Sequence, residues 1–222
     1  MGTGVGALIP DLRAEAACAT IVAVDRSEGM LRLARENGTR FNVPLALMDA
    51  QQVAIASSTI DVAILAFMLF HVAEPHQALL EIKRVLRPGG TIGTVTWGKQ
   101  ERFPAEVVWD EELDAHGAGP DPVASIRHDD LMDTPDKIAA LLGNAGFAQT
   151  RAWTQRFEHQ WGPEAFFAEY GAQRRKLETV QPNVREACVA RIRERLTGMS
   201  DRDFLFTPEI VFATARSSAS FC

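Results

Sequence analysis

The stretch STIDVAILAFMLFHVAEPHQALLEIKRVLRPGGTIGTVTWG, residues 58–98, decides the fold. It contains an apolar run at residues 60–66, helical periodicity over 74–86 and a second run rich in β-branched residues at 91–96. An Arg-Pro-Gly-Gly sequence at 87–90 predicts a turn, because proline fixes one turn residue and glycines permit positive φ. Strand, helix and strand of these lengths predict a parallel pair joined by a crossover helix.

The same alternation extends toward the N-terminus. Residues 20–24 and 44–48 have the composition of short strands, and residues 28–37 between them have the apolar spacing of a helix. An Ala- and Leu-rich helix is expected over 7–18. The pattern predicts an α/β, Rossmann-like fold with a mostly parallel sheet covered by helices.

The regular alternation of predicted strands and helices ends after residue 98. We expect one domain over residues 1–222, closed by an antiparallel hairpin of strands at 148–160 and 206–214. Two stretches between the predicted elements, 99–132 and 161–203, carry no recognisable motif. They are predicted to form a substrate lid over the ligand-binding end of the sheet.

Composition excludes several functional classes. With 222 residues and a formal net charge of −6, the chain is a poor partner for nucleic acid. The longest apolar run is too short to span a bilayer, so we expect no membrane insertion. The three cysteines are widely spaced, which predicts neither a disulfide framework nor a zinc site and favours the cytoplasm. No histidine or carboxylate spacing indicates a metal.

A glycine-rich loop opens the chain at Gly2, Gly4 and Gly6. By itself it fits an ordinary surface turn, or the dinucleotide pattern completed by Ala7. Asp25 ends the next predicted strand nineteen positions after Gly6, where a carboxylate can accept hydrogen bonds from both hydroxyls of a ribose. The alternative for Asp25 is a helix cap. The combination favours a nucleotide-like cofactor.

Two further strand ends carry candidate ligand contacts. Asp49 follows the strand at 44–48 and precedes Ala50 and Gln51, so its carboxylate and the adjacent backbone could read an adenine edge. The alternative is a simple turn residue. Ala66 and Phe67 close the strand at 60–66, where a small residue and an aromatic ring could admit and cover a ligand.

Four motifs occur in order along the sequence: GTGVG, IVAVDRSEGMLRLAREN, LALMDAQQVAI and the stretch at residues 58–98. Together they make the sequence resemble the class I S-adenosylmethionine-dependent methyltransferases. They are most similar to the small-molecule branch that includes the ubiquinone/menaquinone C-methyltransferases. The resemblance covers roughly the first hundred residues, and RVLRPGG is its most specific piece. The later run DTPDKIAALLGNAGF is also similar to the helix and turn before the sixth strand of the family.

This resemblance implies that S-adenosylmethionine is the cofactor and that methyl transfer proceeds by in-line displacement onto a small, partly apolar or aromatic acceptor. It also implies a set of cofactor contacts. The backbone of Gly2, Thr3, Gly4 and Gly6 would approach the methionine and ribose, and Asp25 would bind the ribose hydroxyls. Arg26 and Met30 would flank the faces of the adenine, and its edge would be bound by Asp49, Ala50 and Gln51. Ala66 and Phe67 would lie beside the methionine portion. His71 and His159 are weak catalytic candidates, each more simply explained as structural.

Two alternatives remain. The glycine pattern with Ala7 admits an NAD-dependent oxidoreductase, although no Tyr-x-x-x-Lys pair is recognisable. A truncated or inactive methyltransferase-like protein is the other, because the family has an apolar central strand immediately before the loop, where this sequence has Met1. Loss of about five buried residues would cost on the order of 10 kcal/mol, against a total stability of ~5–15 kcal/mol. We therefore expect the first central strand to be missing, or its position to be filled by other means.

Overall fold

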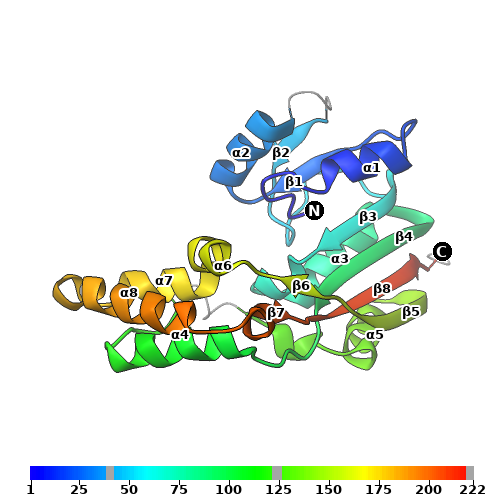
Figure 1. Ribbon diagram of the computed structural model, residues 1–222. Helices are drawn as coiled ribbons and strands as arrows, with labels where there is room; N and C mark the ends of the chain where they lie inside the picture. The colour runs from blue at the N-terminus through cyan, green and yellow to red at the C-terminus, as the bar shows by residue number, and fades with distance from the viewer. Residues whose placement is uncertain (39–42, 122–126, 219–222) are drawn as a thin grey trace. The chain divides into compact units, whose positions relative to one another are not determined.

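The structure is a computed structural model that describes residues 1–38, 43–121 and 127–218 (Figure 1). The chain forms two compact units. The first, called the sheet unit below, consists of residues 1–98, 128–154 and 211–222. The second, called the helical unit, consists of residues 99–127 and 155–210.

The sheet unit is built from parallel strand pairs. Strand β1 (Ala23–Asp25) pairs in parallel with β2 (Leu45–Leu47), and β3 (Ile60–Ala66) pairs in parallel with β4 (Leu86–Trp97). The larger sheet has the order β3-β4-β8-β5, where β5 is Phe147–Arg156 and β8 is Glu209–Ser217. Strand β8 runs against β5, as the ribbon shows (Figure 1). The predicted fold, mostly parallel with an antiparallel C-terminal hairpin, is confirmed.

The register of β3 and β4 corrects one sequence prediction. The expected turn at residues 87–90 lies inside β4, which begins at Leu86 and continues through Trp97. Ile60 pairs with Leu86 whereas Val62 pairs with Thr91, so the Arg-Pro-Gly-Gly residues form an irregularity within the strand. The positive φ of 76° at Gly89 explains why glycine is required there.

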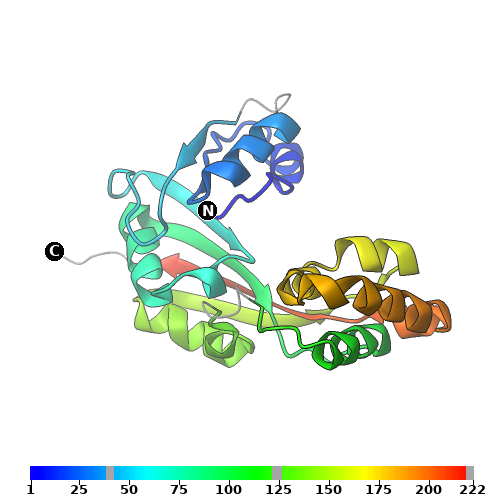
Figure 2. The ribbon, with the colours of Figure 1, turned by 90° about the vertical axis from the view of Figure 1, so that its left-hand side faces the viewer.

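Helices supply the apolar cover of the sheet unit. They are α1 (Ile9–Glu15), α2 (Glu28–Gly38), α3 (Pro75–Val85) and α5 (Pro135–Asn144), with short 3-10 turns at Leu69–His71 and Asp129–Leu131 (Figure 2). The apolar residues of α3 recur at helical spacing and are buried with those of α5 against the sheet. Their core comprises Leu65, Ala78, Leu79, Ile82, Ile92, Ile138, Leu142, Phe147, Val211 and Ala213, among others.

Strands β1 and β3 are not paired with each other. The structure places β1 and β2 in a separate two-stranded sheet, and within the described residues no strand joins it to the four-stranded sheet. Residues 1–3 lie in this gap: the Met1 amine donates to Ile64 O at 2.9 Å, and Thr3 N–H donates to Val24 O at 3.0 Å. The expectation of a missing first central strand agrees with this arrangement.

The helical unit has its own core. It contains α4 (Pro104–Ala115), α6 (Pro163–Glu169), α7 (Gly171–Thr179), α8 (Pro182–Thr197), a 3-10 turn at Asp201–Phe204 and the antiparallel pair β6 (His159–Gln160) and β7 (Leu205–Phe206). Its buried residues are Phe103, Ala105, Trp109, Leu113, Phe166, Val180, Cys188, Ile192, Leu196 and Phe204. The segments expected to form a lid, 99–132 and 161–203, lie largely in this unit, and their role as a lid stays a prediction.

Candidate cofactor site

The three glycines of the opening loop all have positive φ, but their surroundings differ. A Cβ added at Gly2 would lie 2.5 Å from the Cβ of Met68, and one at Gly6 would lie 3.3 Å from the Cβ of Ala34 on α2. These two glycines permit close packing. A Cβ at Gly4, where φ is 53°, would meet nothing within 4 Å. The loop therefore presents its backbone to open space at Gly4, which suits the close approach of a ligand.

Asp25 joins the end of β1 to this loop. Its Oδ2 accepts a hydrogen bond from Gly4 N–H at 2.8 Å, and its Oδ1 accepts one from Ser27 N–H at 2.9 Å. A carboxylate offers about four lone-pair positions on its two oxygens, so acceptor capacity remains for two hydroxyl groups. The same carboxylate thus shapes the loop and can hold a ribose. Thr3 is fixed beside it through its N–H bond to Val24 O.

Asp49 lies at the same edge of the two-stranded sheet. Asp25 pairs with Leu47, and Asp25 O accepts a hydrogen bond from Met48 N–H at 3.0 Å, so Asp49 follows directly. Its Oδ1 accepts from Gln51 N–H at 2.8 Å. This geometry is that of a turn residue, with an exposed side chain. Its role in reading adenine stays a prediction.

The two residues after Asp49 are held firmly. Ala50 is buried in the core of the sheet unit. The side-chain oxygen of Gln51 accepts from Glu74 N–H at 2.8 Å, which connects this turn to the start of α3.

Arg26 and Met30 are exposed near the start of α2, where either side chain is available to cover a planar ring.

Phe67, after β3, has an unusual backbone. Its φ is 51°, a left-handed conformation that costs a bulky residue of order 1–3 kcal/mol and that clusters at functional sites. Its N–H donates to Val95 O at 2.8 Å, and its ring lies 4.6 Å from that of Trp97. The Phe67 side chain is 38% exposed, so part of this ring is accessible to a ligand. Ala66 precedes it, half-buried.

The structure brings the glycine loop, Asp25, Asp49 and Phe67 into one unit at the ends of β1, β2 and β3. Sequence reasoning missed Met68, which follows Phe67 and contacts Gly2. It also missed Trp97, the partner of Phe67. No sequence signal identifies either residue, because each contact joins residues that are far apart in the chain and meet only in the folded protein.

The two histidine candidates lie in different units. His71 is exposed in the 3-10 turn after β3, with its ring 4.3 Å from that of Phe70. His159 is exposed on β6 of the helical unit, and its ring packs edge-on against Trp161 at 4.4 Å. A catalytic role for either residue stays a prediction. In the part of the chain that the structure describes, no group of three or more histidine, cysteine or carboxylate side chains is arranged to hold a metal ion.

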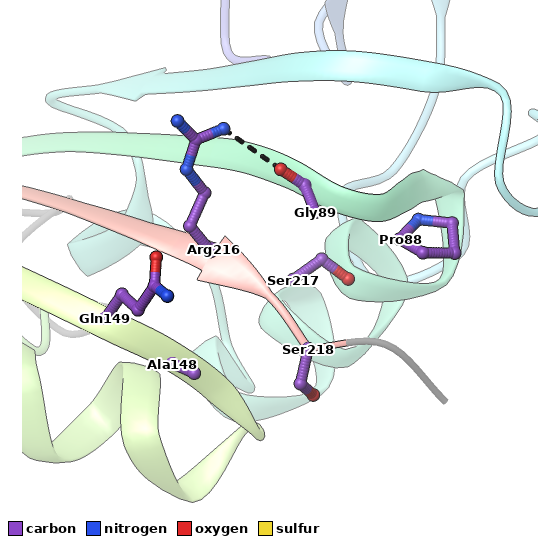
Figure 3. Close-up of a pocket in the computed structure, with 7 residues that line it drawn as sticks. All are labelled: Pro88, Gly89, Ala148, Gln149, Arg216, Ser217 and Ser218. Carbon is purple, nitrogen blue, oxygen red and sulfur yellow. Dashed lines mark hydrogen bonds between the residues drawn. The ribbon is translucent and has the colours of Figure 1, made fainter. Parts of the chain in front are cut away.

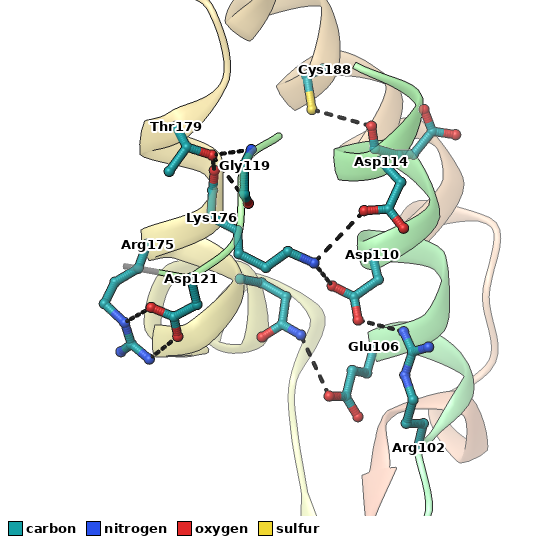
Figure 4. A network of polar contacts seen from close by, with 12 residues as sticks. Arg102, Glu106, Asp110, Asp114, Gly119, Asp121, Arg175, Lys176, Thr179 and Cys188 are labelled. Carbon is teal, nitrogen blue, oxygen red and sulfur yellow. Dashed lines mark hydrogen bonds and ion pairs between the residues drawn. The ribbon is translucent and has the colours of Figure 1, made fainter. Parts of the chain in front are cut away.

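A polar cluster in the helical unit was not predicted (Figure 4). Glu106 on α4 accepts from Gln173 Nε2 on α7 at 3.4 Å, and the hydroxyl of Tyr170 lies near its carboxylate. Burial raises the pKa of Glu106, and burial together with the Glu106 charge raises the pKa of Tyr170. Nearby, Lys176 Nζ donates to Asp110 at 2.8 Å. The cluster fastens α7 to α4.

A hollow in the sheet unit lies at the beginning of β4 and the end of β8 (Figure 3). Arg216 Nη1 donates to Gly89 O at 3.0 Å beside it. The parallel strands begin at this edge, whereas ligands of open α/β sheets bind at the carboxyl ends of the strands. The hollow is therefore separate from the candidate cofactor site. It is lined by Pro88, Gly89, Ala148, Gln149, Arg216, Ser217 and Ser218.

Among the helices described, none is both long and apolar enough to cross a membrane.

Comparisons with known proteins agree with the geometry. Residues 1–93 match the family described as methyltransferase domain. A curated relative, the ubiquinone/menaquinone biosynthesis C-methyltransferase UbiE of Teredinibacter turnerae, is 29% identical over 146 residues, which cover 59% of this chain and 58% of that protein. The chain thus spans less than two thirds of the length of this relative.

Solved structures show the same fold. The YcgJ protein from Bacillus subtilis has a TM-score of 0.61 at 15% identity, over 99% of this chain and 90% of that one. Phosphoethanolamine N-methyltransferase 2 of Haemonchus contortus, solved with phosphomonomethylethanolamine and S-adenosylhomocysteine, has a TM-score of 0.57 at 16% identity, over 98% of this chain and 48% of that one. The predicted resemblance and fold are confirmed.

Proposed function

We propose that this chain binds S-adenosylmethionine and transfers its methyl group to a small molecule, because residues 1–93 match the family described as methyltransferase domain. The observation that carries the proposal is the contact between Asp25 and Gly4, which holds an open glycine backbone beside a carboxylate with free acceptor capacity. A glycine loop of this shape with a carboxylate at the next strand end matches a ligand that contains a ribose.

Each end of the ligand has residues of suitable chemistry. Asp25 accepts from the two ribose hydroxyls, and Gly4 allows close backbone approach. Asp49, Ala50 and Gln51 receive the adenine edge, between Arg26 and Met30. Ala66 and Phe67 lie beside the methionine portion, where an aromatic ring attracts a sulfonium by cation–π interaction.

S-adenosylmethionine supplies a methyl carbon to which the acceptor forms a bond while the carbon–sulfur bond breaks and its electron pair stays on sulfur. The protein contributes mainly proximity, orientation and exclusion of water. An acceptor that carries a proton must lose it. His71 and His159 are the residues we propose to test for that step.

For the acceptor, we propose a small, partly apolar or aromatic molecule. One observation supports this class: a relative is named as a ubiquinone/menaquinone biosynthesis C-methyltransferase. We propose that segments 99–132 and 161–203 form the lid that selects it. The spaced cysteines and the net charge of −6 support a cytoplasmic location and no nucleic-acid partner.

Calorimetric titration tests the cofactor. We expect saturable binding of S-adenosylmethionine and S-adenosylhomocysteine, and no binding of NADH. Binding of NADH alone would instead support an NAD-dependent oxidoreductase. No heat with any of the three would contradict the proposed function for this chain.

A second candidate is an inactive methyltransferase-like protein, favoured because no strand lies between β1 and β3 within the described residues. It predicts cofactor binding that is weak or unaccompanied by transfer. An acceptor screen that follows formation of S-adenosylhomocysteine separates the two: turnover with any small acceptor supports the enzyme, and binding without turnover across quinols, phenols and amines supports the inactive protein.

A further inference from the structure

The hollow at the beginning of β4 and the end of β8 lies within the sheet unit and takes no part in the candidate cofactor site (Figure 3). Its volume is about 540 Å³. Pockets that hold small molecules have volumes of this size. The residues around the hollow therefore decide whether it has a ligand of its own.

Irregular backbone on both sides of β8 forms the hollow. Strand β8 lies between β4 and β5 in the sheet. On the β4 side, the irregular residues 87–90 place Pro88 and Gly89 at the rim. On the β5 side, Phe147 and Ala152 both pack against the core, although a regular strand would direct them to opposite faces. Strand β5 therefore contains a bulge between these two residues.

Gln149 accommodates this bulge. Its φ is 53°, a left-handed conformation that is unfavourable for a residue other than glycine. Bulges redirect side chains and are frequent beside functional sites. Gln149 and Arg216 extend from the neighbouring strands β5 and β8 at the hollow (Figure 3). The bulge thus supplies the hollow with an amide that both donates and accepts hydrogen bonds.

Arg216 gives the hollow a positive charge. Among the described residues that line it, Arg216 alone is charged. Its Nη1 donates to Gly89 O at 3.0 Å, which holds the guanidinium at the rim. The guanidinium has further N–H groups, which remain available to a ligand. Lys83 adds a second positive charge close by, because its ammonium lies against Gly146, whose carbonyl accepts from Ser218 Oγ at 2.9 Å.

Ser217 is an independent observation at the same place. It lines the hollow and is only 5% exposed. Its hydroxyl forms no hydrogen bond to any other residue that the structure describes. Buried hydroxyl groups normally have a hydrogen-bond partner. An oxygen atom of a ligand in the hollow would provide one.

We propose that the hollow binds a small oxyanion, the phosphate or carboxylate group of a small molecule, through Arg216, Ser217 and Gln149. The planar guanidinium forms paired hydrogen bonds with either group. The Ser217 hydroxyl and the Gln149 amide donate to its remaining oxygens. This is a second ligand site, because it lies at the edge of the sheet where the parallel strands begin, whereas the glycine loop and Asp25 lie at their carboxyl ends.

The test is a nuclear magnetic resonance titration of the isotope-labelled full chain with inorganic phosphate, in which sodium chloride keeps the ionic strength constant. We expect saturable shifts confined to the amides around Gly89, Gln149 and Ser217, with a low-millimolar dissociation constant. A second titration with acetate distinguishes the two sources of the anion. Tighter phosphate binding supports a phosphate ligand, and equal or tighter acetate binding supports a carboxylate.

Arg216→Gln should weaken phosphate binding about tenfold, because it removes charge-assisted hydrogen bonds. Ser217→Ala should weaken it about threefold, and this variant keeps the Arg216 bond to Gly89 and therefore the fold of the rim. Arg87→Gln is the matched control. It also removes a positive charge from this edge, but Arg87 pairs with Asp61 and does not line the hollow, so affinity should stay unchanged.

Shifts that rise without saturation would overturn the proposal. So would equal weakening in Arg216→Gln and Arg87→Gln, because the anion would then respond only to the overall charge of this edge. Unchanged affinity in Ser217→Ala would remove Ser217 from the site and contradict the proposal as stated. The titrations contain no cofactor, so their result stands apart from the proposed function.

Discussion

The backbone N–H of Gly4 donates a 2.8 Å hydrogen bond to Oδ2 of Asp25, which joins the opening loop to the end of β1. One carboxylate therefore fixes the loop and, under the proposed function, receives the ribose. Hydrogen bonds to a charged acceptor contribute about 1.5–3 kcal/mol each, more than bonds between neutral groups.

We expect Asp25→Asn to weaken S-adenosylmethionine binding about 10- to 100-fold, because the amide keeps the shape but loses the charge and one acceptor position. Calorimetry measures the change. Asp61→Asn is the control, since Asp61 forms an exposed ion pair with Arg87 away from the site, and its loss should leave affinity unchanged. Equal affinities of the two variants would contradict the role of Asp25.

Gly2→Ala and Gly4→Ala should separate folding from binding. At Gly2 a methyl group would lie 2.5 Å from Met68 Cβ, so we expect a clear loss of Tm. At Gly4 the methyl group meets nothing within 4 Å, so the cost is that of positive φ alone, about 1–2 kcal/mol. Cofactor affinity should nevertheless fall at Gly4, because the methyl group would occupy the space that the ligand needs.

Gly117→Ala is the control for positive φ in open space, because Gly117 has a φ of 71° and no neighbour within 4 Å in the helical unit. Its Tm should match that of Gly4→Ala while its cofactor affinity stays that of the unmodified chain. Normal affinity in Gly4→Ala would show that the open face of the loop is not the binding face.

The sequence predicts elements whose signals are local. Helix α2 begins after Ser27, whose hydroxyl accepts from Met30 N–H at 3.3 Å and so caps the helix. Helix α3 lies within the expected range because its apolar spacing is regular. The prediction of a turn at Arg87–Gly90 was wrong. These residues form an irregular part of β4, because pairing with β3 outweighs the turn preference of the local sequence.

Site residues also differ in whether a local sequence signal or a contact between distant residues determines their positions. The positions of the glycine loop and Asp25 could be predicted because motif spacing encodes them. The Gly2 contact with Met68 and the Glu106 contact with Tyr170 could not, because they join residues far apart in the chain. Helix α7 was also missed: its polar residues give a weak apolar stripe, and contacts with α4 hold it in place.

Glu106 should make stability depend on pH. Burial raises its pKa in the folded protein, so between about pH 4.3 and that raised pKa the folded state retains a proton that the unfolded state has lost. This contribution to the free energy of unfolding therefore decreases as pH rises through that range. Glu106→Gln removes it, and we expect the Tm advantage of the variant to grow as pH rises.

Thermal unfolding at several pH values measures this effect. Glu101→Gln is the control, because Glu101 is exposed in the same unit, just before α4. Its Tm difference from the unmodified chain should be small at every pH. A Glu106→Gln variant whose Tm difference is constant with pH would contradict the assigned titration.

Arg84 fastens α3 to the segment before β3. Its guanidinium donates to both carboxylate oxygens of Glu81 at 2.9 Å, to Val53 O at 2.8 Å, to Ile55 O at 2.9 Å and to Ser57 Oγ at 3.2 Å. A lysine cannot reproduce this planar set of donors. We expect Arg84→Lys to lower the free energy of unfolding by about 1–2 kcal/mol, measured by urea titration. Arg87→Lys is the control, because it alters one exposed ion pair with Asp61 and should change the free energy of unfolding by less than about 0.5 kcal/mol. Equal losses in the two variants would show that the hydrogen bonds of Arg84 to the 53–57 segment contribute nothing measurable.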